Sequence, residues 1–374
     1  MIVGKVFTMH FVTHNLSHAV RTALIASLLF FPIQARSAQN SPDQILKVIR
    51  HIVDDAIVPA YDNFAQKAQI LADAVDTHCL GPHAQRAFRD AFLAWQKVQH
   101  LHLEPSQTEN RQHRIQFWPD PKNIGQRQLK KFLKSFSSRS LTEKNQKFDG
   151  MRISVAVQGF PALERLLSQN PTSSHETVCI AASAISRNIA TIAHDILHDW
   201  RQNFRQKLLT PTASDPLFRT PEDSLRAMYT AFSTLLQTLG NIKLNRPLGL
   251  QQGRPRPKRG ESWRSGLTLE AMKINLQTAL DMYTGRPHHP GLGGLVDPQF
   301  SIVNTTILHG LSEAHRLLAD VQQNYTWEEA LTQPAGHQKM RLIQAHVDTA
   351  YRSVAEDLSG ILGLGLGFNA LDGD

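Results

Sequence analysis

The sequence predicts an all-α protein made of two helical-bundle domains, each resembling a four-helix bundle. Apolar residues recur three and four residues apart through most of the chain after residue 40, as on the buried face of an amphipathic helix. Alternating β-branched runs, which are typical of strands, are almost absent. With 374 residues, of which 41% are hydrophobic and 19% charged, the chain is long enough for two domains and able to bury ordinary cores.

The first 38 residues have the pattern of a secretory signal peptide. They contain three basic residues and no acidic residue, an apolar run at 23–31 and the small residues Ala35, Ser37 and Ala38. The apolar run is about half as long as the ~20 residues that a membrane span needs. We therefore expect export to the periplasm, cleavage near residue 38 and no stable membrane span in the mature chain. The alternative is a leader that stays uncleaved as an N-terminal anchor.

Residues 39–210 are expected to form the N-terminal bundle. Helical periodicity runs from Ile45 to Val75, with Pro59 inside it, and Gly81 and Pro82 end the pattern. Further helices fit residues 84–102, 125–136, 150–168 and 176–209.

Residues 211–219 are expected to be a linker, and residues 220–374 the C-terminal bundle. The second bundle begins at Thr220, an N-cap that is followed by Pro221 and by acidic residues in the first turn. Its helices fit residues 221–239, 267–284, 300–323 and 336–362, whereas residues 245–266 are irregular and basic.

Composition and motifs exclude several functional classes. The net charge of +8 is a mild excess that partly belongs to the leader, so we expect no nucleic-acid partner. The chain has no His-Glu-x-x-His, no Gly-x-Ser-x-Gly and no phosphate-binding Gly-x-x-x-x-Gly-Lys-Ser/Thr string, which disfavours the common hydrolase and NTPase machineries. Cys79 and Cys179 would lie in an oxidising compartment, where both a disulfide and two buried thiols are compatible with the sequence.

Several histidines are candidate metal ligands. His194 and His198 are four residues apart, as are His309 and Glu313, so each pair lies on one helix face. A metal site needs at least a third ligand from elsewhere in the fold. The alternative interpretation of each pair is a polar helix face in contact with solvent. A further candidate pair, His288–His289, lies in a Pro/Gly loop. Another candidate group lies at a helix end and consists of His100, His102 and Glu104.

A connection between two expected helices concentrates charged and aromatic side chains. Residues 109–121 contain Arg111, Arg114, Trp118 and Asp120. Arginine forks bind carboxylates with two hydrogen bonds, and loops on rigid scaffolds often hold binding residues. The alternative is a long connection whose aromatic residues fill the core.

Glu164 is a carboxylate within an otherwise apolar stretch. Pro161 lacks an N–H and clashes with the preceding turn, so the helix must kink or restart near Gly159. The kink frees backbone carbonyls close to Glu164. A carboxylate flanked by leucines is either paired with an arginine or serves as a ligand.

Four strings in order resemble the imelysin-like family, most closely its branch of bacterial periplasmic proteins. The strings are FWPDP at 117–121, QGFPALE at 158–164, WRSG at 263–266 and GFNALDGD at 367–374. The resemblance extends over about residues 42–374. It implies two helical bundles with a functional site in the groove between them, a periplasmic or envelope location and, for several relatives, a role in iron uptake.

The family has a sequence signature from which this chain departs at one position. The family was named for a proposed insulin-cleaving metallopeptidase, and its signature is Gly-x-His-x-x-Glu. Gly159 and Glu164 match it, but Pro161 stands where the signature has histidine. Because proline has no side-chain ligand atom, the peptidase interpretation and a His/Glu metal site are both weakened, while Glu164 remains.

We therefore expect a periplasmic imelysin-like protein that binds a small molecule or a metal ion, such as iron, between its two bundles. Glu164 is the expected metal ligand, and no catalytic residue is assigned. The expected ligand-binding residues are Arg111, Arg114, Trp118, Asp120, Glu164, Trp263, Arg264, Asn369 and Asp372. The alternatives are an imelysin-type metallopeptidase and an envelope module that binds partner proteins through the basic loop 254–259.

Overall fold

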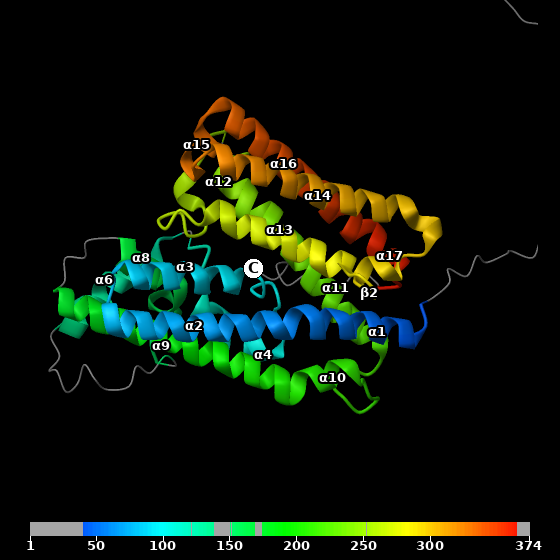
Figure 1. Cartoon of the computed structure of the whole chain (residues 1–374), viewed down its shortest axis with the longest axis horizontal. Coiled ribbons are helices and arrows are strands. Elements are labelled where there is room, and N and C mark those ends of the chain that lie inside the picture. Colours follow the sequence, from blue (N-terminus) through cyan, green and yellow to red (C-terminus); the bar gives the residue numbers. More distant parts are fainter. Residues whose placement is uncertain are drawn as a thin grey trace, which may run out of the picture. The chain divides into compact units, whose positions relative to one another are not determined.

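Figure 1 shows a computed structural model of the chain, in which residues 40–120, 122–137, 150, 152–168, 174–251 and 253–364 are described. Helices account for most of these residues, as predicted. The expected signal peptide and the string 367–374 lie outside the described residues. Within the described part, none of the helices combines the length and the apolar character that crossing a bilayer requires.

The N-terminal half is a bundle in which one long helix contacts two others. Its elements are α1 (Pro42–His51), the π-helical turn η1 (Ile52–Ile57), α2 (Val58–His78), α3 (Pro82–Gln96), α4 (Glu104–Gln107), η2 (Thr108–Asn110), α5 (Arg111–Ile115), α6 (Ile124–Ser137), η3 (Val155–Val157), α8 (Gly159–Ser168), α9 (His175–Asp199), the π-helical turn η4 (Trp200–Phe204) and α10 (Arg205–Leu209). Helix α2 packs against α3 and α9, and α9 also packs against α6 and α8.

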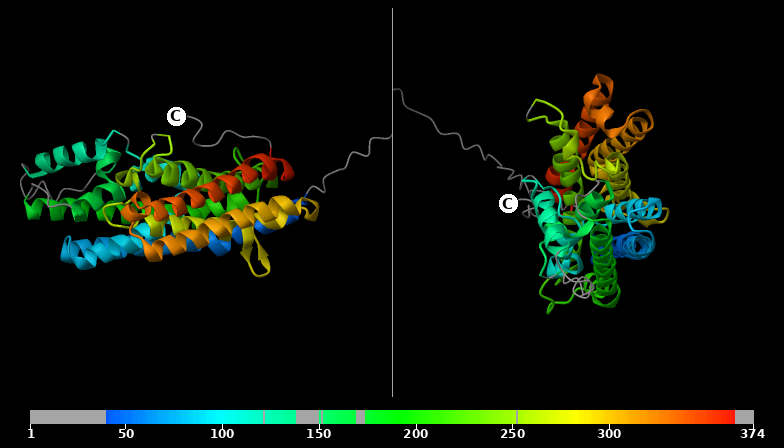
Figure 2. Two further views of the ribbon diagram at one scale, coloured as in Figure 1. Left: turned by 90° about the horizontal axis from the view of Figure 1, so that it is seen from above. Right: turned by 90° about the vertical axis from the view of Figure 1, so that its left-hand side faces the viewer.

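The C-terminal half is a second set of packed helices with one short hairpin. Its elements are α11 (Pro221–Gln237), the π-helical turn η5 (Thr238–Asn245), α12 (Arg246–Leu248), η6 (Pro257–Arg259), α13 (Thr268–Thr284), β1 (Gly285–Arg286), β2 (His289–Pro290), η7 (Leu292–Leu295), η8 (Pro298–Phe300), α14 (Ser301–Asn324), α15 (Trp327–Thr332), α16 (Pro334–Arg352), the π-helical turn η9 (Ser353–Leu358) and α17 (Ser359–Ile361). Helices α14 and α16 lie side by side, and α13 packs on α14 (Figures 1 and 2).

The two halves share helix contacts. Helix α1 packs against α11, and α3 packs against α13. The expected linker, residues 211–219, forms the loop between α10 and α11. The division into two domains at this loop stays a prediction.

Two predicted helix boundaries are wrong. Helix α3 ends at Gln96 instead of residue 102, and a turn follows it. The helix expected from residue 150 begins only at Gly159, after the 3-10 turn η3. Gly159 has φ +69°, and a Cβ at this position would overlap the backbone carbonyl of Ile115. The restart expected near Gly159 is confirmed.

Helices α1 and α2 are joined through η1 without a break in helical backbone geometry. Pro59 lies just after η1, and in an α-helix its ring would clash with the carbonyl of Asp55. A π-helical turn is wider than an α-helical turn, so η1 accommodates the proline within one continuous helix.

A buried ion pair of the C-terminal half is hydrogen-bonded to two side chains of the N-terminal half. Lys243 Nζ lies 2.6 Å from Glu261 Oε2, and both side chains are 2% exposed. Lys243 also donates to Gln96 Oε1 on α3 and to Asn275 Oδ1 on α13, at 2.6 and 2.7 Å. Gln116 Nε2 donates to Glu261 Oε1 at 2.8 Å. Burial lowers the pKa of Lys243, and the charge of Glu261 opposes this shift.

Replacing only one partner of this pair should strongly destabilise the fold. We expect Lys243→Met to lower the free energy of unfolding by about 3–5 kcal/mol, because Glu261 is then a buried charge without a counter-ion. Lys243→Met combined with Glu261→Leu should recover part of this loss. The measurement is urea denaturation followed by circular dichroism. Lys207→Met, in a partly exposed pair with Glu104, is the matched control and should change stability by less than about 1 kcal/mol. Equal losses in the Lys243 and Lys207 variants would contradict the prediction.

Cys79 and Cys179 form a disulfide. The sequence was compatible with this bond and with two buried thiols. The bond joins the C-terminal end of α2 to α9, with the Cα atoms 5.2 Å apart and 100 residues of separation.

Removing this bond should destabilise the protein because a long loop of the unfolded chain is no longer closed. We expect the double variant Cys79→Ser/Cys179→Ser to lose about 2–5 kcal/mol of unfolding free energy. A reducing agent should shift the denaturation midpoint of the wild type and leave that of the double variant unchanged. A wild-type midpoint that does not respond to reduction would contradict the prediction.

Candidate functional site

Three segments that the sequence singled out meet at one cavity of about 130 Å³. The first segment is 116–120 together with Asn123, and it contains Trp118 and Asp120. The second is α8, through Pro161, Glu164 and Arg165. The third is the loop 258–264 with Arg246 beside it, and it brings Trp263 and Arg264. The structure thus brings together five of the predicted ligand-binding residues, from both halves of the chain.

Helix α8 is held in place by an aromatic cluster. Phe160 is fully buried, and its ring lies 5.5–6.2 Å from the rings of Phe64, Phe88 and Phe92. These rings come from α2 and α3, so α8 is fixed against the N-terminal bundle. Glu164 is one turn further along α8 and lines the cavity.

Glu164 is buried and hydrogen-bonded to a residue of the other half. The residue is 3% exposed, and its Oε1 accepts from the backbone N and the Oγ of Ser265, at 3.0 and 2.9 Å. Burial raises the pKa of Glu164, while the Ser265 hydrogen bonds and the charges of Arg264 and Arg165 oppose the shift. Ser265 is not among the predicted site residues, although its place in the WRSG string next to Arg264 is a signal for this role.

Asp120 caps a helix and lies near a buried arginine. Its two carboxylate oxygens accept from the backbone N of Ile124 and of Gly125, both at 2.8 Å, at the start of α6. Arg165 Nη2 lies 3.8 Å from Asp120 Oδ2, and both side chains are less than one-tenth exposed. Arg165 Nη1 also donates to the carbonyl of Pro161. Burial lowers the pKa of Arg165. Asp120 therefore ties α6 to α8 at the wall of the cavity.

Two cations lie near the indole ring of Trp263, which lines the cavity. The guanidinium of Arg264 lies 4.4 Å from the ring centroid of Trp263, and Lys258 Nζ lies 5.8 Å from the same centroid. Cations over an indole face are attracted by its negative potential. Trp118 is half-buried and lines the cavity from the segment that precedes α6.

The cavity carries an excess of positive charge. Its acidic residues are Asp120 and Glu164, and its basic residues are Arg165, Arg246, Lys258, Arg259 and Arg264. A concave site lined by one sign of charge attracts ligands of the opposite sign. Arginine also binds carboxylate and phosphate groups with two hydrogen bonds, so the lining favours an anionic ligand.

Two predicted site residues lie elsewhere in the structure. Arg111 Nη1 binds Asp199 Oδ2 at 2.6 Å, and Arg114 Nη2 donates to Asn188 Oδ1 at 3.0 Å. Both contacts join α5 to α9, and neither arginine is among the described residues that line the cavity. Asn369 and Asp372 lie outside the described residues.

The described side chains include two groups of three potential metal ligands, and Glu164 belongs to neither. One group is Cys79, His175 and Cys179, whose sulfur atoms are joined in the disulfide. The other is His51, Asp55 and His289, and none of these residues lines the cavity. His194 and His198 are exposed on α9 and belong to neither group.

Comparison with known proteins gives one consistent family. A peptidase family model described as Imelysin matches residues 57–353. "Iron-regulated protein A" of Synechococcus elongatus is 22% identical over 284 residues, which cover 68% of this chain and 73% of that protein.

Two solved structures share the fold. An imelysin-like protein from Psychrobacter arcticum 273-4 aligns with a TM-score of 0.70 and 19% identity, over 88% of this chain and 99% of that one. A protein described as an iron-regulated protein A precursor, from Parabacteroides distasonis, aligns with a TM-score of 0.68 and 15% identity, over 85% of this chain and 95% of that one.

Proposed function

Because the chain belongs to the imelysin family and because its cavity carries an excess of positive charge, we propose that it is an exported protein that binds a small anionic ligand. The observation that carries this proposal is the set of five basic side chains around the buried carboxylate of Glu164. The cavity is built from both halves of the chain, so a bound ligand would contact both.

The ligand we propose is an anionic iron chelate with exposed carboxylates. Two relatives are described as iron-regulated proteins, which supports an iron-related role. A bare iron cation would be repelled by the surrounding basic groups, whereas a chelate that carries carboxylates outward would be attracted by them. The half-buried rings of Trp118 and Trp263 would pack against the apolar part of such a ligand.

Direct binding of a metal ion by Glu164 is the alternative at the same cavity. Glu164 already accepts two hydrogen bonds from Ser265. A metal would need further protein ligands, and within the described residues Glu164 is not part of a group that could supply three. The same observation, together with Pro161 at the signature position, gives a peptidase less support than a binding protein.

Export to the periplasm is supported by two independent features. The first 38 residues have the pattern of a signal peptide. The Cys79–Cys179 disulfide is of the kind that forms and persists in an oxidising compartment.

The basic loop 254–259 fits ligand binding better than the docking of a partner protein. Its residues Lys258 and Arg259 line the cavity. Their charges therefore face the site that we propose for the ligand.

Removing one basic side chain should weaken ligand binding. We expect Arg264→Gln to raise the dissociation constant for ferric citrate, which serves as the probe, by about tenfold to a hundredfold, the range of a lost hydrogen bond to a charged group. Isothermal titration calorimetry measures the effect. Arg316→Gln, at an exposed arginine paired with Glu313, is the matched control and should leave affinity unchanged.

The same titrations with ferrous sulfate separate the two interpretations of the cavity. Ferrous ion binding that is lost in Glu164→Gln and unchanged in Arg264→Gln would favour Glu164 as a direct metal ligand. It would contradict the proposal of an anionic ligand.

Binding should also depend on pH through Glu164. Burial raises the pKa of Glu164, so this carboxyl becomes neutral at a higher pH than an exposed glutamate. Its neutral form removes a negative charge beside the anion, so affinity should rise as the pH falls toward the raised pKa. Glu164→Gln should bind more tightly than the wild type at about pH 8, and the difference should vanish at low pH. The ligand's own titration cancels in this comparison. A difference that is independent of pH would contradict the assignment.

A further inference from the structure

Three potential metal ligands lie together outside the arginine-lined cavity. They are His51 at the end of α1, Asp55 in η1 and His289 in β2. His289 Nδ1 lies 2.6 Å from Asp55 Oδ2, and His51 Nδ1 lies 3.6 Å from the same oxygen. The two imidazole rings stack with their centroids 4.1 Å apart and 12° between their planes. The two histidines therefore share one carboxylate oxygen.

The helical run around η1 positions two of these ligands. His51 and Asp55 are four residues apart and so lie on one helix face. The π-helical turn η1 contains Asp55 and precedes Pro59, the residue that makes a regular α-helical turn unfavourable here. Single π-helical turns inside α-helices occur frequently at functional sites.

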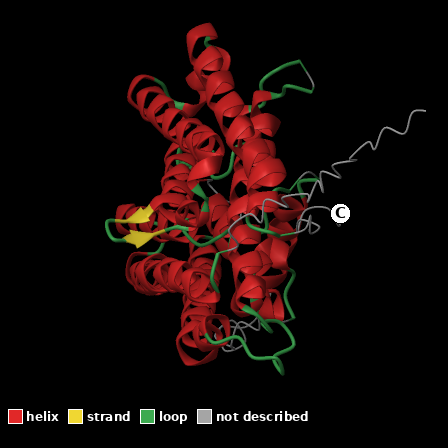
Figure 3. Cartoon of the chain, turned by 90° about the vertical axis from the view of Figure 1, so that its right-hand side faces the viewer, coloured by secondary structure: helices red, strands yellow, loops and turns green. Residues whose placement is uncertain are grey.

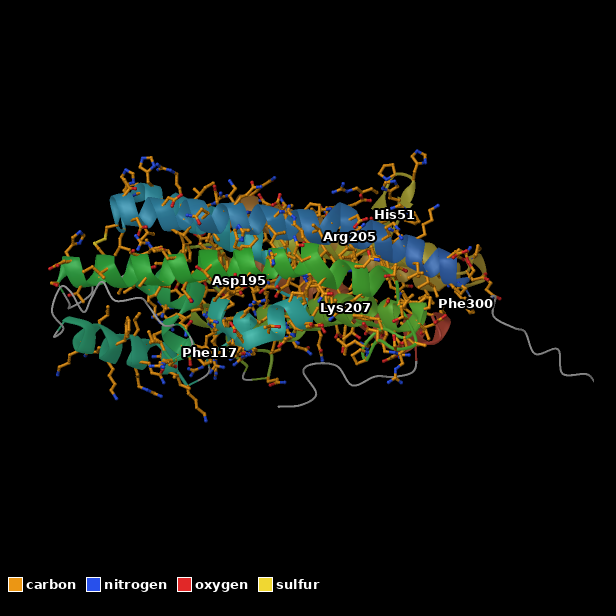
Figure 4. All side chains as sticks on the ribbon, turned by 90° about the horizontal axis from the view of Figure 1, so that it is seen from below. His51, Phe117, Asp195, Arg205, Lys207 and Phe300 are labelled. Atoms are coloured by element: carbon orange, nitrogen blue, oxygen red, sulfur yellow. A yellow bond between two sulfur atoms is a disulfide. The ribbon has the colours of Figure 1, made fainter. Side chains whose placement is uncertain are left out.

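A short hairpin supplies the third ligand. Strands β1 and β2 pair antiparallel, with Arg286 opposite His289 (yellow in Figure 3). Gly285 has φ +72°, and a Cβ at this position would overlap the carbonyl of His289. Strand β2 packs against α1, which brings His289 over His51. Figure 4 shows His51 well separated from Phe117, which lines the other cavity.

The three residues border a cavity, and one imidazole nitrogen there has no hydrogen-bond partner among the described residues. The three residues line a cavity of about 300 Å³. His51 Nε2 is buried and has no hydrogen-bond partner among the described residues. The same cavity also contains Asp281 and the basic residues Lys97 and Arg286, so its charges are mixed, in contrast to the arginine-lined cavity.

We propose that His51, Asp55 and His289 form a binding site for a divalent first-row transition-metal ion. Two imidazoles and one carboxylate are a ligand set that zinc and ferrous iron use in proteins, with further positions open to water or substrate. Metal–ligand bonds of about 2.0–2.2 Å place tetrahedral ligand atoms about 3.3 Å apart. The 3.6 Å separation fits this value, and the 2.6 Å separation would lengthen when a metal replaces the shared proton.

This site differs in chemistry from the cavity proposed to bind an anionic ligand. Nitrogen and carboxylate donors bind a metal ion directly, whereas the arginines of the other cavity bind the anionic groups of a ligand. The open part of the 300 Å³ cavity lies next to the proposed ligands, so a bound metal could hold a further small ligand there.

Zinc titration of the oxidised mature chain tests the proposal. Isothermal titration calorimetry should show one zinc ion per chain, and cobalt, the spectroscopic probe, should give the visible absorption of nitrogen and oxygen ligation. His51→Ala and His289→Ala should each weaken zinc binding by at least about tenfold. His289 is half-exposed on the hairpin, so its variant should fold, and circular dichroism checks this for both variants.

Two control variants make the result specific. His194→Ala removes an exposed histidine that belongs to neither ligand group, and Arg264→Gln alters the other cavity. Both should bind zinc as the wild type does. Zinc affinity that is unchanged in the His51 and His289 variants, or no zinc binding by the wild type at micromolar protein concentrations, would overturn the proposal.

Discussion

The buried pair of Lys243 and Glu261 is the interaction on which the arrangement of the arginine-lined cavity depends. Glu261 lies within the loop that carries Trp263 and Arg264, and Gln116, which donates to its carboxylate, directly precedes Phe117. The carbonyl of Glu261 also accepts from Thr268 at the start of α13. Buried charges are stable only when they are paired and hydrogen-bonded. Both walls of the cavity are therefore anchored in one polar cluster between the two halves.

The sequence predicted most of the helices and part of the site. Long helices such as α9 and α14 follow from the spacing of their apolar residues, which is a local property. The late start of α8 depends on how closely Gly159 approaches Ile115, and this contact is not local. Glu164 could be found because its neighbours are apolar. Arg111 could not be placed correctly, since the direction of its side chain depends on where α5 packs on α9.

The two proposed sites differ in how much of each could be predicted from the sequence. Trp263 and Arg264 could be assigned through their motif, although Glu164 lies on a distant helix. The string His288–His289 is recognisable in the sequence as a possible ligand pair, but Asp55, the partner of His289, is 234 residues away and lies in the π-helical turn η1. No periodicity connects such residues. They meet because a hairpin held by Gly285 packs on α1 beside a π-helical turn.

The disulfide has a consequence for how the protein is produced. When the bond is absent, Cys79 and Cys179 become thiols beside His175, and the three side chains form a potential soft-metal site. A chain that is expressed in a reducing cytoplasm would therefore acquire a sulfur-rich chelating centre that the disulfide-bonded form lacks. Metal found in such a preparation could be bound by the reduced cysteines. Metal binding by the native molecule should therefore be measured on protein whose cysteines are oxidised.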